Sequence, residues 1–272
     1  LNFLKSLFNK QGKYFTGLIL DTRSEKEKED DYYREEITKG SSLQLVSYKT
    51  ASAQKKRYFI FNQRSTLSCV AHAKALLKLI LSGFKANPLF TYRLRSNFPY
   101  AGMIGDNVGK IGKDIGYVSY ETLPAPMTEN MANSIVITDK HLEEAKNNKD
   151  GNYFSVLDRS FNNLASIVNN GEPVMIYIYA TEREWRKKVV EIMDKPILGS
   201  AEIQHAVTIL PNSAFEKDGK KYFIIQDSAH FGGETHREVS EDFINQRCYY
   251  AQTQIERNPQ DIEKPKYKFT KN

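Results

Sequence analysis

The chain has little cysteine and little tryptophan, and it lacks the patterns that define several protein classes. Its 272 residues include only Cys69, Cys248 and a single tryptophan, Trp185. Two cysteines cannot build the disulfide framework of a small secreted domain, which favours a cytoplasmic or virion-associated protein. No run of eighteen apolar residues is present, so no membrane span is predicted. Residues 1–8 lack a signal-peptide layout, although a start at Leu1 instead of Met is compatible with a leader removed upstream.

Patterns for metals and nucleotides are also missing. His230 and His236 flank a Gly-Gly pair, but no Cys pair or His-Glu-x-x-His spacing accompanies them, so no metal is expected. Gly112-Lys113 is followed by Asp114, whereas a phosphate loop needs Ser or Thr there, so no nucleotide cofactor is expected. Glycines instead recur at spacings of three and four, which predicts one stripe on a closely packed helix that ends at the last of them: Gly102, Gly105, Gly109, Gly112 and Gly116.

The net charge excludes few classes of protein or partner. Thirty-nine basic and 33 acidic residues leave a charge of +6, which is modest and consistent with a solvated surface. The stretch Lys264–Lys271 is basic with interleaved aromatics, which fits a disordered terminus better than a contact with nucleic acid or an anionic surface. No specific nucleic-acid partner is predicted.

The most informative stretch that is present runs from Gln63 through Cys69. Positions 73, 76, 77 and 80 are apolar and share one face of a helix that opens at Cys69, and Gly83 is a suitable stop. A thiol at a helix N-terminus lies at the positive end of the macrodipole, which favours the thiolate nucleophile. Gln63, placed before this helix, can offer its amide N–H to an oxyanion beside the sulfur.

Two later residues complete a candidate site. His205 lies in the strand-like run Ile203–Leu210, and Asp227 ends another such run, Tyr222–Gln226. Residues this far apart in the sequence can meet only in the fold. Alone, each has a plainer interpretation: Cys69 as a small core residue, His205 as a hydrogen-bonded strand histidine, and Asp227 as part of a turn.

At these residues the chain resembles the papain-like cysteine peptidases. Their pattern is a Gln, five residues and then the Cys of Ser-Cys-(aromatic)-Ala, followed by His-Ala-Val on a strand and Asn-Ser-Trp-Gly after a further strand. The stretches Asn87–Tyr92 and Asp242–Ala251 are also similar, and the resemblance covers roughly residues 55–253. It implies that Cys69 is the nucleophile, Gln63 an oxyanion donor and His205 the base. Asp227 takes the place of the imidazole-orienting Asn.

The chain departs from this pattern at several positions. Val70 follows the nucleophile in place of an aromatic residue, and Leu67 replaces a Gly. A carboxylate at Asp227 can hold an imidazole as an amide can. The Trp-Gly that shields this contact in the family is replaced by Ala229-His230, which predicts a wetter and weaker His–Asp bond.

The predicted fold is α+β, with the two-lobed arrangement of the papain-like family and the active-site cleft between the lobes. Residues 69–150 are mainly helical, and a helix near Val156–Asn169 leads into a strand-rich, barrel-like lobe. Its expected strands are Val174–Ala180, Ala206–Leu210, Tyr222–Gln226 and Arg247–Thr253. The segment Thr181–Ser200, which carries Trp185, either walls the substrate cleft or forms a surface helical loop.

Three segments are predicted along the chain. Residues 1–54 form an N-terminal arm, residues 55–253 the peptidase-like domain, and residues 254–272 a basic tail. The arm contains a strand-like piece, Tyr14–Leu20, and a charge-dense helical stretch, Ser24–Ile37. It is either a propeptide-like inhibitory, docking or tethering segment, with a possible docking partner through residues 3–8, or a solvated helix on a flexible arm.

The functional prediction is a cysteine endopeptidase acting on a protein or peptide substrate without a cofactor. A first alternative is a weak or inactive papain-like scaffold with a structural role, for instance in a virion or surface assembly. A second is a peptidoglycan-peptide hydrolase, although such enzymes lack the upstream Gln and carry a closer His. His72 could compete as the base, but its place on the same rigid helix as Cys69 predicts a polar-face residue.

Overall fold

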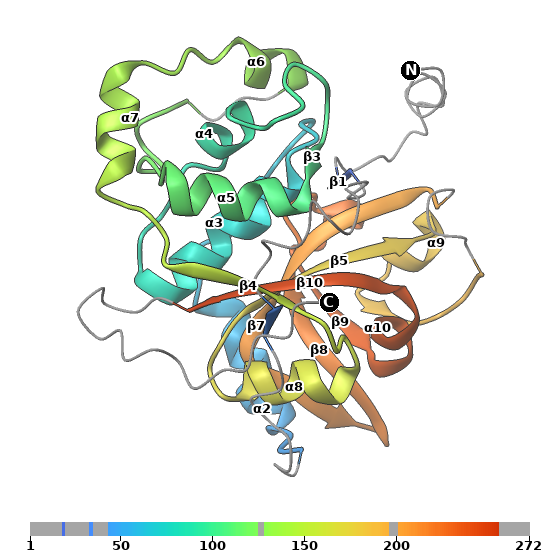
Figure 1. Cartoon of the computed structure of the whole chain (residues 1–272). Coiled ribbons are helices and arrows are strands. Elements are labelled where there is room, and N and C mark those ends of the chain that lie inside the picture. The colour runs from blue at the N-terminus through green and yellow to red at the C-terminus, as the bar shows by residue number, and fades with distance from the viewer. Residues whose placement is uncertain (1–17, 20–32, 35–42, 125–127, 196–200, 256–272) are drawn as a thin grey trace.

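The computed structural model of the chain describes residues 18–19, 33–34, 43–124, 128–195 and 201–255 (Figure 1). The predicted docking residues 3–8, most of the stretch Ser24–Ile37 and residues 256–272 of the predicted tail lie outside the described residues. Tyr33–Arg34, inside the stretch predicted to be helical, instead forms a short strand, β2. No helix within the described ranges is long and apolar enough to cross a membrane.

The first half of the described chain is helical. Its helices are α2 (Tyr48–Ala53), α3 (Cys69–Ser82), α4 (Pro88–Arg93), α5 (Gly105–Asp114), α6 (Glu129–Ser134) and α7 (Asp139–Lys146). Helix α3 begins and ends where the sequence predicts: Gly83, at φ 72°, closes it in the left-handed conformation that glycine adopts without strain. Asn87 caps α4 by accepting the backbone N–H of Leu89, with Pro88 in the first turn.

Helix α5 carries three of the five glycines of the predicted stripe, Gly105, Gly109 and Gly112, whereas Gly102 precedes the helix; the close packing is mainly against aromatic side chains. A Cβ atom built on Gly105 would lie 2.6 Å from the ring of Tyr177, and one on Gly109 would lie 2.7 Å from the ring of Tyr153. Gly116 follows the end of the helix at φ 100°, and a Cβ atom built on it would lie 1.9 Å from the Ala145 carbonyl oxygen. These contacts bring α5 onto the sheet, beside the start of α3.

The second half contains a sheet of eight strands. Besides β2 these are β4 (Asn152–Val156), β5 (Val174–Ala180), β6 (Val189–Val190), β7 (Ile203–Lys217), β8 (Lys220–Gln226), β9 (His236–Ser240) and β10 (Cys248–Ile255). The order is β2-β4-β10-β5-β7-β8-β9-β6, with antiparallel pairing from β4 to β9 and parallel pairing at both ends. The described strands do not close on themselves, so the expected barrel-like lobe is an open sheet.

The core has a helical part and a sheet part that meet at α3. Helices α8 (Phe161–Asn169), α9 (Glu182–Trp185) and α10 (Glu241–Arg247) pack with the sheet in one apolar cluster. The start of α3 shares another cluster with Tyr177 of β5 and Ala206 of β7. In Figure 1 α3 lies between the helical half and the strands. The start of α3 is therefore held directly against the strands that carry the other candidate residues.

A buried ion cluster fixes α3 further along its length. Lys74 and Lys78 contact Asp150 at 3.0 and 3.3 Å, and Lys74 also donates to the Gln254 side chain of β10. Burial opposes ionisation of Asp150, but the two lysines outweigh it and hold the pKa of its carboxyl below the usual range. Removal of one partner from such a cluster leaves an uncompensated buried charge, so the register of α3 against β10 is strongly specified.

Two parts of the predicted N-terminal arm contact the rest of the molecule. Leu18–Ile19 forms β1, which pairs in parallel with β3 (Met103–Ile104). Helix α2 packs on β7, where Ala51 is fully buried and Val46 forms a bridge with Phe215. A truncation that keeps these contacts of α2 must therefore start no later than Leu43, and a start there removes both β1 and β2. The predicted boundary with the tail likewise falls inside β10.

Candidate active site

Cys69 occupies the first residue of α3 and is fully buried. The loop before it is held at several points: the Leu67 N–H donates to Glu129 at 2.8 Å, and the Thr66 hydroxyl donates to the Gln63 carbonyl. The first N–H groups of a helix have no partner within it, so backbone donors are present at the end of α3 where Cys69 lies. The local sequence thus places a thiol and backbone N–H donors together at the N-terminus of α3.

His205 and Asp227 meet on neighbouring strands of the sheet. β7 and β8 run antiparallel with Thr208 opposite Gln226, which brings the residue after β8 close to His205. Nε2 of His205 lies 2.8 Å from Oδ1 of Asp227, and both side chains are fully buried. The pair expected from the sequence is therefore formed in the structure.

The other imidazole nitrogen of His205, Nδ1, takes no part in the bond to Asp227. Nδ1 is buried and has no hydrogen-bond partner among the described residues, whereas the Cys69 side chain acts on the ring electrostatically. Burial opposes protonation of the imidazole, but the Asp227 carboxylate and the Cys69 sulfur outweigh it and raise the pKa of His205 to about 9. The structure thus joins His205 to Asp227 by a hydrogen bond, and the sulfur of Cys69 acts on the same ring.

Asp227 accepts four hydrogen bonds. Oδ1 accepts from His205 and from the Ala229 N–H at 2.8 Å, and Oδ2 accepts from Trp185 Nε1 at 3.1 Å and from Arg237 Nε at 2.9 Å. Burial works against its ionisation, but His205 and Arg237 keep the pKa of the Asp227 carboxyl well below its ordinary value. The carboxylate is ionised and fully coordinated.

Trp185 corrects the prediction of an unshielded His–Asp contact. The residue comes from α9, inside the segment Thr181–Ser200, and its side chain is fully buried. Its ring meets the His205 ring edge-on at 5.8 Å between centroids, and Phe231 approaches at 6.4 Å with an interplanar angle of 85°. A tryptophan from a different segment therefore covers the contact that the replaced Trp-Gly would otherwise leave open.

Gln63 has its amide fixed at both ends. Its Nε2 donates to the Thr66 carbonyl at 2.9 Å, and its Oε1 accepts from the Ser228 hydroxyl at 2.9 Å. The Gln63 N–H also donates to the Ser228 carbonyl. These bonds join the loop before Cys69 to the residue after Asp227, so they connect the helical and strand-borne parts of the site directly.

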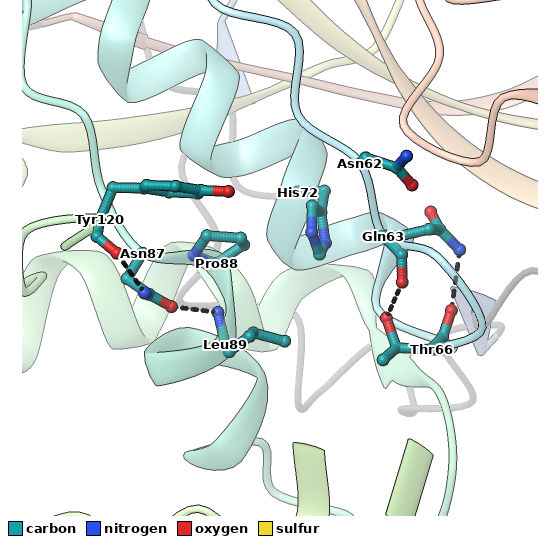
Figure 2. A pocket seen from close by; sticks show the side chains of 8 residues that line it. All are labelled: Asn62, Gln63, Thr66, His72, Asn87, Pro88, Leu89 and Tyr120. Carbon is teal, nitrogen blue, oxygen red and sulfur yellow. Dashed lines mark hydrogen bonds between the residues drawn. The ribbon is translucent and has the colours of Figure 1, made fainter. Parts of the chain in front are cut away.

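His72 is not the exposed polar-face residue that the sequence suggests. It is 4% exposed, and its Nδ1 lies 3.0 Å from both the hydroxyl and the carbonyl of Ser68. Burial lowers its pKa to about 4, so the ring is neutral and unsuited to pairing with a thiolate. Figure 2 shows it lining a small pocket with Gln63, Thr66 and Tyr120.

The remaining candidate residues lie elsewhere. His230 Nε2 lies 3.0 Å from the Phe61 carbonyl, and His236 Nδ1 lies 3.1 Å from the Thr235 hydroxyl. Within the described part of the chain, no group of three His, Cys, Asp or Glu residues could hold a metal ion. Cys69 and Cys248 are both free, and burial raises the pKa of the Cys248 thiol to about 12.

Two residues at the site, Trp185 and Arg237, were missed by reasoning from the sequence. As the only tryptophan, in a segment expected either to wall the cleft or to form a surface loop, Trp185 carried a weak signal. Arg237 carried none, because its strand β9 is five residues long and contains three polar residues besides. Only the strand order places Arg237 beside the end of β8.

The raised pKa of His205 predicts a pH-dependent contribution to stability. A histidine with a folded pKa of about 9 and an unfolded pKa of about 6.5 stabilises the fold fully below pH 6.5, and this contribution is lost as pH rises through 9. The difference in unfolding free energy between the wild type and His205→Gln should therefore shrink from pH 7 to pH 10 in urea titrations. The matched control His72→Gln should give a constant difference above about pH 7, because this buried ring is already neutral. A constant difference for His205→Gln would contradict the assignment.

The arrangement has the fold of the papain-like cysteine proteases. Similar solved structures are xylellain, a cysteine protease from Xylella fastidiosa (15% identity, TM-score 0.66, covering 89% of this chain and 96% of that one), and digestive procathepsin L2 from Tenebrio molitor larval midgut (13%, 0.68, 91% and 80%). A third is proCathepsin B S9 from Trypanosoma congolense (11%, 0.63, 92% and 89%). No family model and no curated protein matches the sequence. At these identities the likeness establishes the fold.

Proposed function

We propose that the chain is a cysteine endopeptidase that hydrolyses peptide bonds with Cys69, His205 and Asp227. The observation that carries this proposal is the buried His205–Asp227 hydrogen bond, which leaves Nδ1 of the same ring for Cys69 at the start of α3. The similarity to solved cysteine proteases supports the same reaction class. The substrate class is a protein or peptide, and no cofactor takes part.

Acylation begins from a Cys69 thiolate and a protonated His205. The sulfur attacks the peptide carbonyl carbon, and the developing oxyanion is held by the Cys69 backbone N–H and the Gln63 amide. His205 then transfers its proton to the leaving amine nitrogen, the carbon–nitrogen bond breaks, and a thioester remains on Cys69. Asp227 keeps the ring in the orientation that presents Nδ1 to the sulfur and to the leaving group.

Deacylation uses the same residues in the reverse roles. The neutral imidazole of His205 takes a proton from water, and the resulting hydroxide attacks the thioester carbonyl. The second oxyanion is held by the same two donors, and its collapse releases the carboxylic acid and returns the thiolate–imidazolium pair. The burial of the His205–Asp227 bond beneath Trp185 excludes water from the contact that maintains this geometry.

Selective labelling of Cys69 tests this proposal. A peptidyl epoxide should alkylate Cys69 and leave Cys248 unmodified, because Cys248 is buried and has a pKa of about 12. Peptide mapping by mass spectrometry after a short reaction identifies the modified thiol, and His205→Ala should slow the labelling. Preferential labelling of Cys248, or equal labelling of both, would refute the proposal.

The same experiments distinguish the endopeptidase from two alternative functions. A papain-like scaffold with a structural role would show neither epoxide labelling nor hydrolysis, despite its intact fold. A peptidoglycan-peptide hydrolase would be labelled at Cys69 but would cleave cell-wall peptides and leave unrelated peptides intact. The endopeptidase is favoured because Gln63 supplies an oxyanion donor upstream of the nucleophile.

We also propose that the first part of the N-terminal arm occludes the site. Leu18 is 1% exposed and belongs to the same apolar cluster as Cys69, together with Met103 and Tyr177. Strand β1 contacts β7, which carries His205. An arm in this place would keep the endopeptidase inhibited until it is displaced or removed, and a docking partner that binds the arm would activate it.

A further inference from the structure

Arg237 is a buried cation in direct contact with the candidate triad. Its side chain is fully buried on β9, and its Nε donates to Oδ2 of Asp227 at 2.9 Å. Its two terminal nitrogens donate to the carbonyl oxygens of Lys187 and Phe231, at 2.7 and 2.6 Å. Each guanidinium nitrogen thus has a partner, and among these partners only Asp227 is charged.

The charge of Asp227 requires such a partner. An uncompensated buried carboxylate is costly, and it holds a proton on a neighbouring imidazole more tightly than a neutral amide does. In the resembled family the corresponding residue is a neutral Asn. At this position, therefore, Asp227 with Arg237 carries the same net charge as that Asn.

We propose that Arg237 is a positioning residue that neutralises Asp227, so that the Asp227–Arg237 pair acts on His205 as one neutral orienting unit. Its meaning for catalysis rests on the proposed endopeptidase function. The pair separates two tasks between the carboxylate oxygens: Oδ1 orients His205, while Oδ2 is held by Arg237 and Trp185. Arg237 itself does not touch the reacting atoms.

The hydrogen bonds around Asp227 exclude a simple replacement by Asn. All four groups that face the carboxylate are donors: His205 Nε2, the Ala229 N–H, Trp185 Nε1 and Arg237 Nε. An amide has one oxygen and one NH₂ group, so in either orientation its NH₂ would face donors on one side. Although the resembled family has Asn at this position, we therefore expect Asp227→Asn to lower the activity, unless Arg237 is replaced at the same time.

Other titratable groups do not obscure this test. Cys69 and His72 interact electrostatically with His205, and His236 interacts with Asp227. Burial lowers the pKa of both His72 and His236 to about 4, so their rings stay neutral above about pH 6. A Cys69→Ala background removes the thiol, and it makes the measurement independent of hydrolysis.

The experiment is an NMR titration of the His205 imidazole in this Cys69→Ala background. Arg237→Gln, which keeps a nitrogen near the position of Nε but loses the charge, should raise the pKa of His205 by about one unit. Asp227→Asn should lower it, and the double variant Asp227→Asn/Arg237→Gln should return it to between the two single variants. Arg237→Lys, which keeps the charge, should change it less than Arg237→Gln does.

Arg247→Gln is the matched control. Arg247 is also buried in an ion pair, at 3.2 Å from Glu184, and it donates to the Asp194 carbonyl, but it does not contact Asp227. This variant should be destabilised without a shift in the His205 titration. If Arg237 has only a structural role, its replacement will behave like that of Arg247, and the proposal is then wrong.

Stability and kinetics give two independent readouts. The double variant Asp227→Asn/Arg237→Gln should lose less unfolding free energy than the sum of the losses in the two single variants. Additive losses, or failure of the double variant to fold, would overturn the inference. In the active chain, Arg237→Gln should lower kcat roughly tenfold with little change in KM and move the alkaline limb to higher pH. If the wild type fails to hydrolyse peptides while the titration shifts as described, the proposed function fails and the charge compensation stands.

Discussion

Replacement of Cys69 by alanine should abolish peptide hydrolysis while leaving the fold intact. The side chain is small and lies at the first residue of α3, so its removal deletes one sulfur from a helix held by other contacts. Loss of the nucleophile from a comparable catalytic triad costs on the order of a millionfold in kcat. The measurement is kcat/KM on a fluorogenic peptide, with circular dichroism and urea unfolding to establish that the variant is folded.

Cys248→Ala is the matched control for this substitution. Cys248 is also buried and free, but it lies on β10 and has no imidazole partner among the described residues. Its replacement should leave kcat/KM within about twofold of the wild type, as expected for a position outside the catalytic residues. Hydrolysis retained by Cys69→Ala would show that another residue is the nucleophile, or that the measured activity comes from a contaminant.

The sequence was sufficient for the parts of the site that depend on local order. A cysteine before an amphipathic stretch and a glycine after it predict the bounds of α3, because capping and apolar spacing are local properties. The run Val174–Ala180 is apolar at every position that faces the core, so β5 could be predicted with its bounds. His205 and Asp227 were found because one lies on a strand-like run and the other directly after the next, in the order of the resembled family's pattern.

The sequence was insufficient where strand order decides the outcome. Asp227 is reached by Arg237 only because β9 pairs with β8, with Gln226 opposite His236, and no local pattern contains that pairing. Trp185 reaches His205 from a segment between β5 and β7. Both contacts change the chemistry expected at Asp227, since one shields the His–Asp bond and the other compensates its charge.

The same limitation applies to the N-terminal arm. The run Tyr14–Leu20 is apolar enough to predict a strand, but its partner is β3, more than eighty positions later in the chain. Met103 and Ile104 follow Gly102, whose φ of 79° suits glycine and turns the chain into this strand. Pairing of β1 with β3 brings Leu18 into the cluster of Cys69, which is a tertiary property that apolar periodicity cannot reveal.

Removal of residues 1–42 should increase hydrolysis of a small peptide on the order of a hundredfold. The full burial of Cys69 and His205 means that a substrate must displace what covers them, and burial of one leucine side chain such as Leu18 is worth roughly 1.5–3 kcal/mol, or about 10- to 150-fold in rate. A start at Leu43 retains α2 and the buried Ala51, so this truncation should fold, whereas a start at Gln54 would remove that helix. The measurement is kcat/KM for the full and shortened chains.

Leu18→Asp in the full chain separates occlusion from other effects of truncation. A charge in the buried position of Leu18 should drive β1 away from the cluster and raise kcat/KM toward the value of the shortened chain, because an unpaired buried carboxylate is strongly unfavourable. Lys49→Asp, on the exposed face of α2, introduces the same side chain and should leave the activity unchanged. A folded shortened chain with unaltered or lower activity would show instead that β1 is an integral strand that builds the site, since its contact with β3 would then be needed to hold Met103 in place.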